Sequence, residues 1–133
     1  NPNKQFHGFQ GFNFFQPSKG WSSGPTALWL ASTHAHDTIY ILGFDFHGKK
    51  DEQGNRTKVN NLYAGTHNYK RSGEPATYFG NWERQTASTC EGHARTQYIR
   101  VVEDGDDFVP KQLKKVENLT HISVGEFRKY YDF

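Results

Sequence analysis

Asp45 and His47 are the residues of this chain whose types and spacing best suit acid–base chemistry. They follow an almost continuous apolar run, Ile39 to Phe44, which is typical of a strand covered on both faces. In an open parallel sheet, ligands bind beyond the carboxyl ends of the strands. There Asp45 could orient a base or hold a ribose hydroxyl or a metal, and His47 could act as general acid or base. The alternative is structural: Asp45 caps a turn and His47 is a solvated loop residue.

A polar turn formed by Ser22, Ser23 and Gly24 precedes this strand and opens a predicted helix. Free amides and the positive dipole end of the helix would suit a phosphate or a carboxylate. Gly24 would allow close approach of a ligand. The alternative is ordinary capping, with a serine as the cap and Pro25 at the first helical position. The turn lacks the spacing of a Walker loop or a Gly-x-Gly-x-x-Gly fingerprint.

A third group of hydrogen-bonding side chains lies between residues 60 and 70. It comprises Asn60, Asn61, Tyr63, Tyr69 and Lys70. These side chains could bind sugar hydroxyls and a phosphate. The alternative is a polar connection that satisfies its own backbone groups through the asparagine side chains.

Other reactive residue types do not form a recognisable site in the sequence. His34 and His36 have the spacing of metal ligands, but they are predicted to lie at the amino end of the strand, away from the ligand edge. We therefore predict no metal site. The acidic run of residues 103–107 lacks EF-hand spacing and indicates a solvated turn. Cys90 has no neighbouring pattern that would make it a nucleophile.

Alternating helices and strands must position these groups. The pattern predicts helices from about residue 25 to about 34–37, from about 78 to 91 and from 125 to 131, and strands at 39–44, 96–102 and 119–124. A helix closely followed by a buried strand favours the α/β class. We expect a single domain over residues 1–133, with a mostly parallel sheet of about three to five strands.

Composition narrows the functional classes. Hydrophobic residues make up 34% of the chain, but aromatics reach 16%, so a core rich in rings is expected. The net charge of +2 is too small to predict a nucleic-acid partner. The single cysteine favours a reducing compartment, the cytoplasm, and no apolar run is long enough to span a membrane. Because the chain begins at Asn1 and contains no methionine, we expect it to be a piece of a longer protein.

The Ser-Gly turn, the Ala-containing helix and the run Ile39-Tyr40-Ile41-Leu42-Gly43-Phe44-Asp45-Phe46 resemble a pattern in two protein groups. These are the bacterial sialyltransferases of glycosyltransferase family 42 and the MptE-like pterin diphosphokinases, with similar phage proteins of unknown role. The resemblance covers about residues 21–70. It implies a Rossmann-like, three-layer fold that binds a nucleotide.

The same resemblance implies roles for individual residues. Ser23 and Gly24 match the turn that lies against the nucleotide, Tyr63 or Tyr69 would contact its phosphate, and His67 would correspond to the catalytic histidine. The family's first strand and its Gly-Asn nucleotide loop have no counterpart here, so the chain would represent the C-terminal part of a larger fold.

The leading functional hypothesis is a transferase-like domain, glycosyltransferase-like or diphosphokinase-like and of phage origin, that binds a nucleotide or nucleotide sugar. Asp45, His47 and His67 are its candidate catalytic residues. Two alternatives stay open: a non-catalytic phage accessory protein that works within an oligomer or assembly, and a nuclease that uses Asp45 and His47 with a metal.

Overall fold

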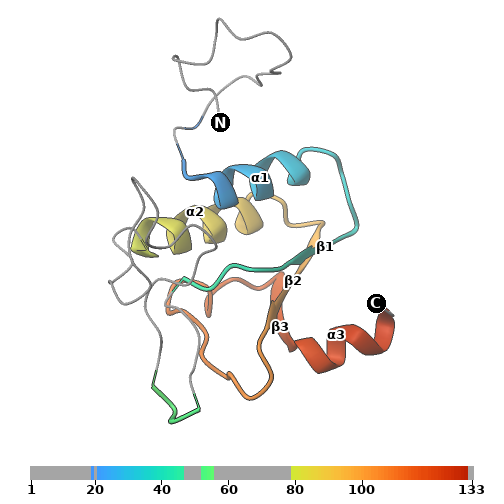
Figure 1. The fold of residues 1–133 in the computed structure, drawn as a ribbon. Helices are drawn as coiled ribbons and strands as arrows, with labels where there is room; N and C mark the ends of the chain where they lie inside the picture. The colour runs from blue at the N-terminus through green and yellow to red at the C-terminus, as the bar shows by residue number, and fades with distance from the viewer. Residues whose placement is uncertain (1–18, 20, 47–51, 56–78, 132–133) are drawn as a thin grey trace, which may run out of the picture.

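The computed structural model describes residues 19, 21–46, 52–55 and 79–131 (Figure 1). In chain order the elements are α1 (Ser23–Ser32), β1 (Thr38–Ile41), α2 (Phe79–Glu91), β2 (Gln97–Val102), β3 (Leu119–Ser123) and α3 (Val124–Tyr130). The strands form a three-stranded sheet in the order β1-β2-β3, and both pairings are parallel. The predicted small parallel α/β domain is therefore confirmed for the described residues.

Helices lie on both faces of this sheet (Figure 1). Tyr98 of β2 is fully buried and its hydroxyl lies 2.6 Å from Ser32 Oγ of α1. Ser32 already donates its own hydroxyl proton to Leu28 O at 2.7 Å, so Tyr98 is the donor of this bond. On the opposite face, the Tyr40 ring of β1 packs 5.2 Å from the Phe127 ring of α3. The sheet is thus the middle of three layers.

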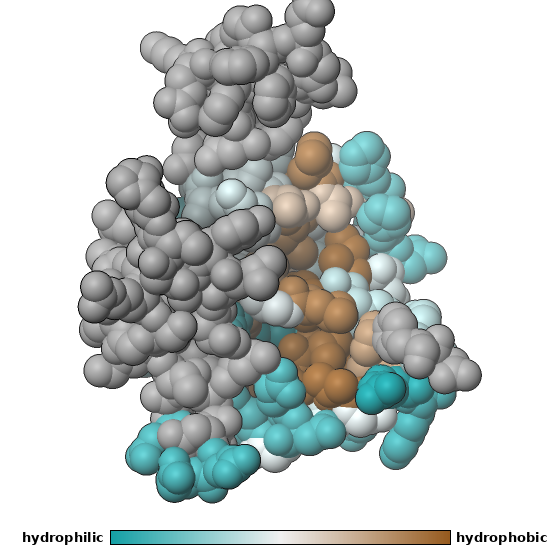
Figure 2. All heavy atoms as spheres, viewed as in Figure 1, coloured by the Kyte–Doolittle hydropathy of each residue, from teal (hydrophilic) through white to brown (hydrophobic). Residues whose placement is uncertain are grey.

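The main core lies between the sheet and the α1–α2 pair. Its members are Leu28, Ile41, Phe46, Ala87, Cys90, Tyr98, Leu113, Val116 and Leu119. On the face seen in Figure 2, hydrophobic side chains gather in the middle, with hydrophilic residues to their right and below them. Leu113 and Val116 belong to the connection between β2 and β3, so this connection covers the sheet where a helix would ordinarily stand.

The amino edge of the sheet is closed by structural hydrogen bonds. The Asn118 side-chain amide donates to Cys90 O, His93 O and Thr96 O at 2.8, 3.0 and 2.9 Å. Thr96 Oγ1 donates to His36 O at 2.8 Å. These bonds tie the end of α2 and the approaches to all three strands together, so the Asn118 and Thr96 side chains serve the fold.

Three predicted boundaries were wrong, each for a local backbone reason. The first strand ends at Ile41 rather than at residue 44, because Gly43 adopts φ +77° and turns the chain, which leaves Leu42 53% exposed. The first helix ends at Ser32, and Ala35 has φ +53° just beyond it. Pro25 is the third residue of α1, not the first. The other elements begin and end within about two residues of their predicted limits.

No helix in the described ranges is long and apolar enough to cross a membrane.

Candidate functional site

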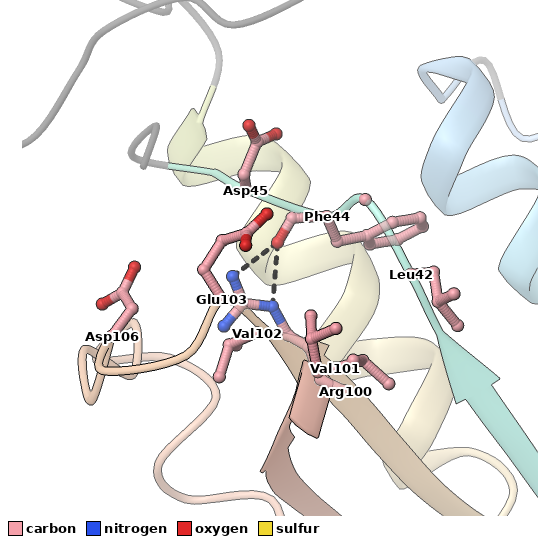
Figure 3. A pocket seen from close by; sticks show the side chains of 10 residues that line it. Leu42, Phe44, Asp45, Arg100, Val101, Val102, Glu103 and Asp106 are labelled. Atoms are coloured by element: carbon pink, nitrogen blue, oxygen red, sulfur yellow. Dashed lines mark hydrogen bonds between the residues drawn. The ribbon is translucent and has the colours of Figure 1, made fainter. Parts of the chain in front are cut away.

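A pocket of about 230 Å³ opens at the carboxyl edge of the sheet (Figure 3). Because all three strands are parallel, their last residues and the start of α3 meet at this edge. The lining residues come from these ends and from the two segments that follow β1 and β2: Leu42, Gly43, Phe44, Asp45, Arg100, Val101, Val102, Glu103, Asp106 and Val124. The pocket is where the sequence predicted a ligand site, and it contains Asp45.

Arg100 holds the wall of this pocket in place. It projects from β2 on the same face as Tyr98, two residues earlier, and is only 5% exposed. Its Nε donates to Phe44 O at 2.8 Å, and its Nη2 donates to the same oxygen. Its guanidinium carbon lies 5.1 Å from the centre of the Phe46 ring. Arg100 therefore contacts the residues on both sides of Asp45 and fixes the segment that presents this carboxylate.

Carboxylates give the pocket its polar character. Asp45, Glu103 and Asp106 all line the pocket; in Figure 3 the Glu103 carboxylate lies beside the Arg100 guanidinium, whereas the Asp45 side chain points away from it and Asp106 lies to one side. Asp106 also accepts a hydrogen bond from Phe108 N at 3.1 Å, which shapes the loop after β2. Carboxylates accept hydrogen bonds, so this lining suits hydroxyl and amino groups better than phosphate oxygens.

The acidic run was predicted to be a solvated turn, and most of it is exposed, but Asp104 serves the fold as Asp106 does. Asp104 Oδ1 accepts a hydrogen bond from Gly125 N at 2.8 Å, and Ser123 Oγ accepts one from Glu126 N at 3.1 Å. Both bonds satisfy amides of the first turn of α3. The loop is thereby anchored to the helix that borders the pocket.

The Ser-Gly turn lies at the same edge, next to the segment that carries Asp45. A Cβ atom placed on Gly24 would stand 3.3 Å from Cζ of the Phe44 ring. The ring thus fills the space that a ligand was expected to use, and packing against Phe44 accounts for the glycine. Ser22 is the N-cap residue of α1, yet its side chain makes no capping bond, and its Oγ is buried without a hydrogen-bond partner.

The first turn of α1 offers few donors to an anion. Thr26 N already donates to Ser22 O at 3.0 Å, and Pro25 has no N–H group. The amides that precede the first helical hydrogen bond are therefore those of Ser23 and Gly24. Ser23 is exposed, so this residue is the accessible part of the predicted turn.

A second pocket, of about 310 Å³, lies beside the first and shares Val102, Glu103 and Asp106 with it. His121 of β3 lines this pocket and pairs with Arg100 in the sheet. Burial, and then the charge of Arg100, lower the pKa of His121 to about 4. Its Nε2 is buried without a hydrogen-bond partner. His121 is therefore a neutral imidazole at physiological pH, and no pattern in the sequence singled it out.

Seven of the predicted site residues lie outside the described residues. They are His47, Asn60, Asn61, Tyr63, His67, Tyr69 and Lys70. The structure thus brings together Asp45 and the Ser22–Gly24 turn through the Phe44 ring, and the rest of the predicted constellation stays a prediction.

The residues that we set aside lie away from this edge. His34 and His36 are exposed, at the start of β1, with ring centroids 6.5 Å apart. Among the described residues, no group of three or more His, Cys, Asp or Glu side chains could hold a metal ion. Cys90 is fully buried, and this burial raises the pKa of its thiol to about 12, so the thiolate needed of a nucleophile does not form near neutral pH.

Arg100 is the important residue that sequence reasoning missed. The signal was available: it is a charged residue at an inward position of an alternating strand, with Tyr98 and Val102 on the same face. A charge at such a position must be paired or hydrogen-bonded.

Comparisons of this chain with protein-family models, with curated proteins and with solved structures found no match.

Proposed function

We propose that the carboxyl edge of the sheet binds a nucleotide or a nucleotide sugar, and that the domain serves a transferase reaction in the cytoplasm. The observation that carries the proposal is the pocket of about 230 Å³ at the ends of the parallel strands, with Asp45 among its lining residues. Parallel α/β sheets bind ligands at this edge. The amino edge is closed by the hydrogen bonds of Asn118 and Thr96, which leaves the carboxyl edge as the open one among the described segments.

The charge of the pocket supports a specific orientation of the ligand. Asp45, Glu103 and Asp106 would repel a phosphate but accept hydrogen bonds from sugar hydroxyls. We therefore assign the ribose or the transferred sugar to the pocket. The phosphate would lie toward the start of α1, near the Ser23 amide, which is separated from the pocket by Phe44.

The reaction that fits this arrangement is direct displacement at an activated sugar or phosphate, in which positioning makes the main contribution. Asp45 would hold and orient the sugar. The general base would come from His47 or His67, as the sequence predicts. The resemblance to glycosyltransferase family 42 and the MptE-like proteins supports the same class of ligand.

A ligand screen tests the proposal. The chain would be titrated calorimetrically with CMP, CDP and ATP, and the melting temperature would be measured with each. We expect saturable binding of at least one nucleotide and a higher melting temperature in its presence. No heat and no thermal shift with any of the three would contradict the proposal. Light scattering after size exclusion would then show whether the chain forms the obligate oligomer expected of an assembly protein.

A further inference from the structure

A third hollow, of about 460 Å³, lies between α2 and residues 111–115. Three cationic side chains line it: Arg84 from α2, and Lys111 and Lys115 from the connection between β2 and β3. All three are exposed. Glu91 is the one carboxylate among the lining residues, so the hollow carries an excess of positive charge.

The cations are presented by a rigid framework. Arg84, Ser88 and Glu91 are spaced by four and three residues, so they share one face of α2. On the other side, Gln112 Nε2 donates to Gly80 O at 3.0 Å and ties the connection to the helix. Leu113, between the two lysines, is 1% exposed. The backbone that carries the lysines is therefore fixed against α2, so a ligand has to order the three exposed side chains but not the segments that bear them.

The donors of the hollow match a phosphate. Arg84 has five N–H donors, and its hydrogen bond to Asn81 Oδ1 is long, at 3.5 Å. Arginine recognises phosphate through paired hydrogen bonds, and lysines add point charges. The Ser88 hydroxyl adds a neutral donor to the same wall. The volume suits a small molecule.

We propose that this hollow binds a small phosphorylated ligand. The site is separate from the carboxyl-edge pocket, with which it shares no lining residue, and the proposal does not rest on the proposed function. A small ligand fits better than a nucleic acid because the net charge of the whole chain is only +2 and the three cations line one hollow of about 460 Å³.

Inorganic pyrophosphate is the probe for the test. Its binding would be measured by calorimetry at low ionic strength for the full chain, for the double variant Lys111→Gln/Lys115→Gln, and for the control Arg128→Gln/Lys129→Gln. The control removes the same two charges from the exposed end of α3. We expect one saturable site, a loss of about tenfold or more in the Lys111/Lys115 variant, and a change of about twofold or less in the control.

Equal losses in the two double variants would show non-specific attraction and overturn the proposal, as would the absence of pyrophosphate binding. Single-stranded oligonucleotides give a further way to overturn the proposal. If they bind through Lys111 and Lys115 far more tightly than pyrophosphate, with an affinity that rises with their length, the hollow is part of a nucleic-acid surface. Circular dichroism melting of each variant checks folding. Asp45→Asn should leave pyrophosphate binding unchanged, because Asp45 lines the other pocket and pyrophosphate has no sugar. A failure of pyrophosphate to bind would therefore leave the proposed nucleotide site unaffected.

Discussion

Replacing Arg100 by lysine would test whether this side chain holds the pocket wall. Lysine keeps the positive charge but can reach Phe44 O through a single nitrogen, whereas arginine donates through Nε and Nη2. The substitution would also remove the guanidinium from the Phe46 ring. One hydrogen bond to a charged group contributes about 1.5–3 kcal/mol, and a cation–ring contact about 0.5–1 kcal/mol. We therefore expect Arg100→Lys to lower the free energy of unfolding by about 2–4 kcal/mol.

Urea denaturation measures this loss, with Arg95→Lys as the control. Arg95 is exposed, so its conservative substitution should change the free energy of unfolding by about 0.5 kcal/mol or less. A second readout separates local from global effects. Arg100→Lys should speed hydrogen exchange at the backbone amides of residues 43–46 more than it speeds exchange at the amides of the α1–α2 core. If Arg100→Lys were as stable as the control and exchange at residues 43–46 were unchanged, the assigned role of Arg100 would be refuted.

Three further substitutions test the packing and the ionisation of residues in and around the sheet. Gly24→Val places branched carbons against the Phe44 ring and should destabilise the chain by about 1–3 kcal/mol in urea denaturation; a neutral effect would show that the ring moves away freely. Tyr98→Phe removes the donor to Ser32 Oγ and should lower the free energy of unfolding by about 0.5–1.5 kcal/mol. If this hydrogen bond is the cause, the same substitution should have a much smaller effect in a chain that already carries Ser32→Ala. His121 binds a proton more weakly in the folded chain, with pKa about 4, than at its ordinary value of 6.5, so stability should fall as pH drops from about 6.5 to 4. His121→Gln should flatten that decline in the urea midpoint, and an unchanged pH profile would contradict the assigned burial.

The fold was largely predictable because the relevant signals are local. The alternation of residues 97–102 and the apolar run from Ile39 identified two strands, and the order of helices and strands led to a parallel sheet. Among the boundaries that were wrong, the end of the first strand matters most for the site. Leu42 and Phe44 are apolar, so the sequence predicted that the strand continues through them. The strand ends earlier because Gly43 adopts a positive φ and Phe44 O accepts hydrogen bonds from Arg100, and a local pattern does not predict either feature.

The site was less predictable than the fold, because its residues depend on tertiary contacts. Asp45 could be placed because a parallel strand delivers its next residues to a known edge. Arg100 and His121 could not be placed as easily, because their roles depend on a partner 56 residues away along the chain and on the register between β2 and β3. Gly24 was interpreted as a ligand contact, whereas its neighbour is Phe44, which no local pattern connects to it.

The central claim is that the carboxyl edge recognises the sugar of a nucleotide through Asp45. The most direct measurement is calorimetric titration of CMP into the full chain, into Asp45→Asn and into Asp37→Asn. Asp37 is an exposed aspartate at the amino end of β1, so its variant makes the same charge change at the opposite edge. We predict saturable binding that weakens by about tenfold or more in Asp45→Asn and stays unchanged in Asp37→Asn, because a hydrogen bond to a charged group contributes about 1.5–3 kcal/mol. Equal affinities in all three proteins, or no binding to any of them, would contradict the claim.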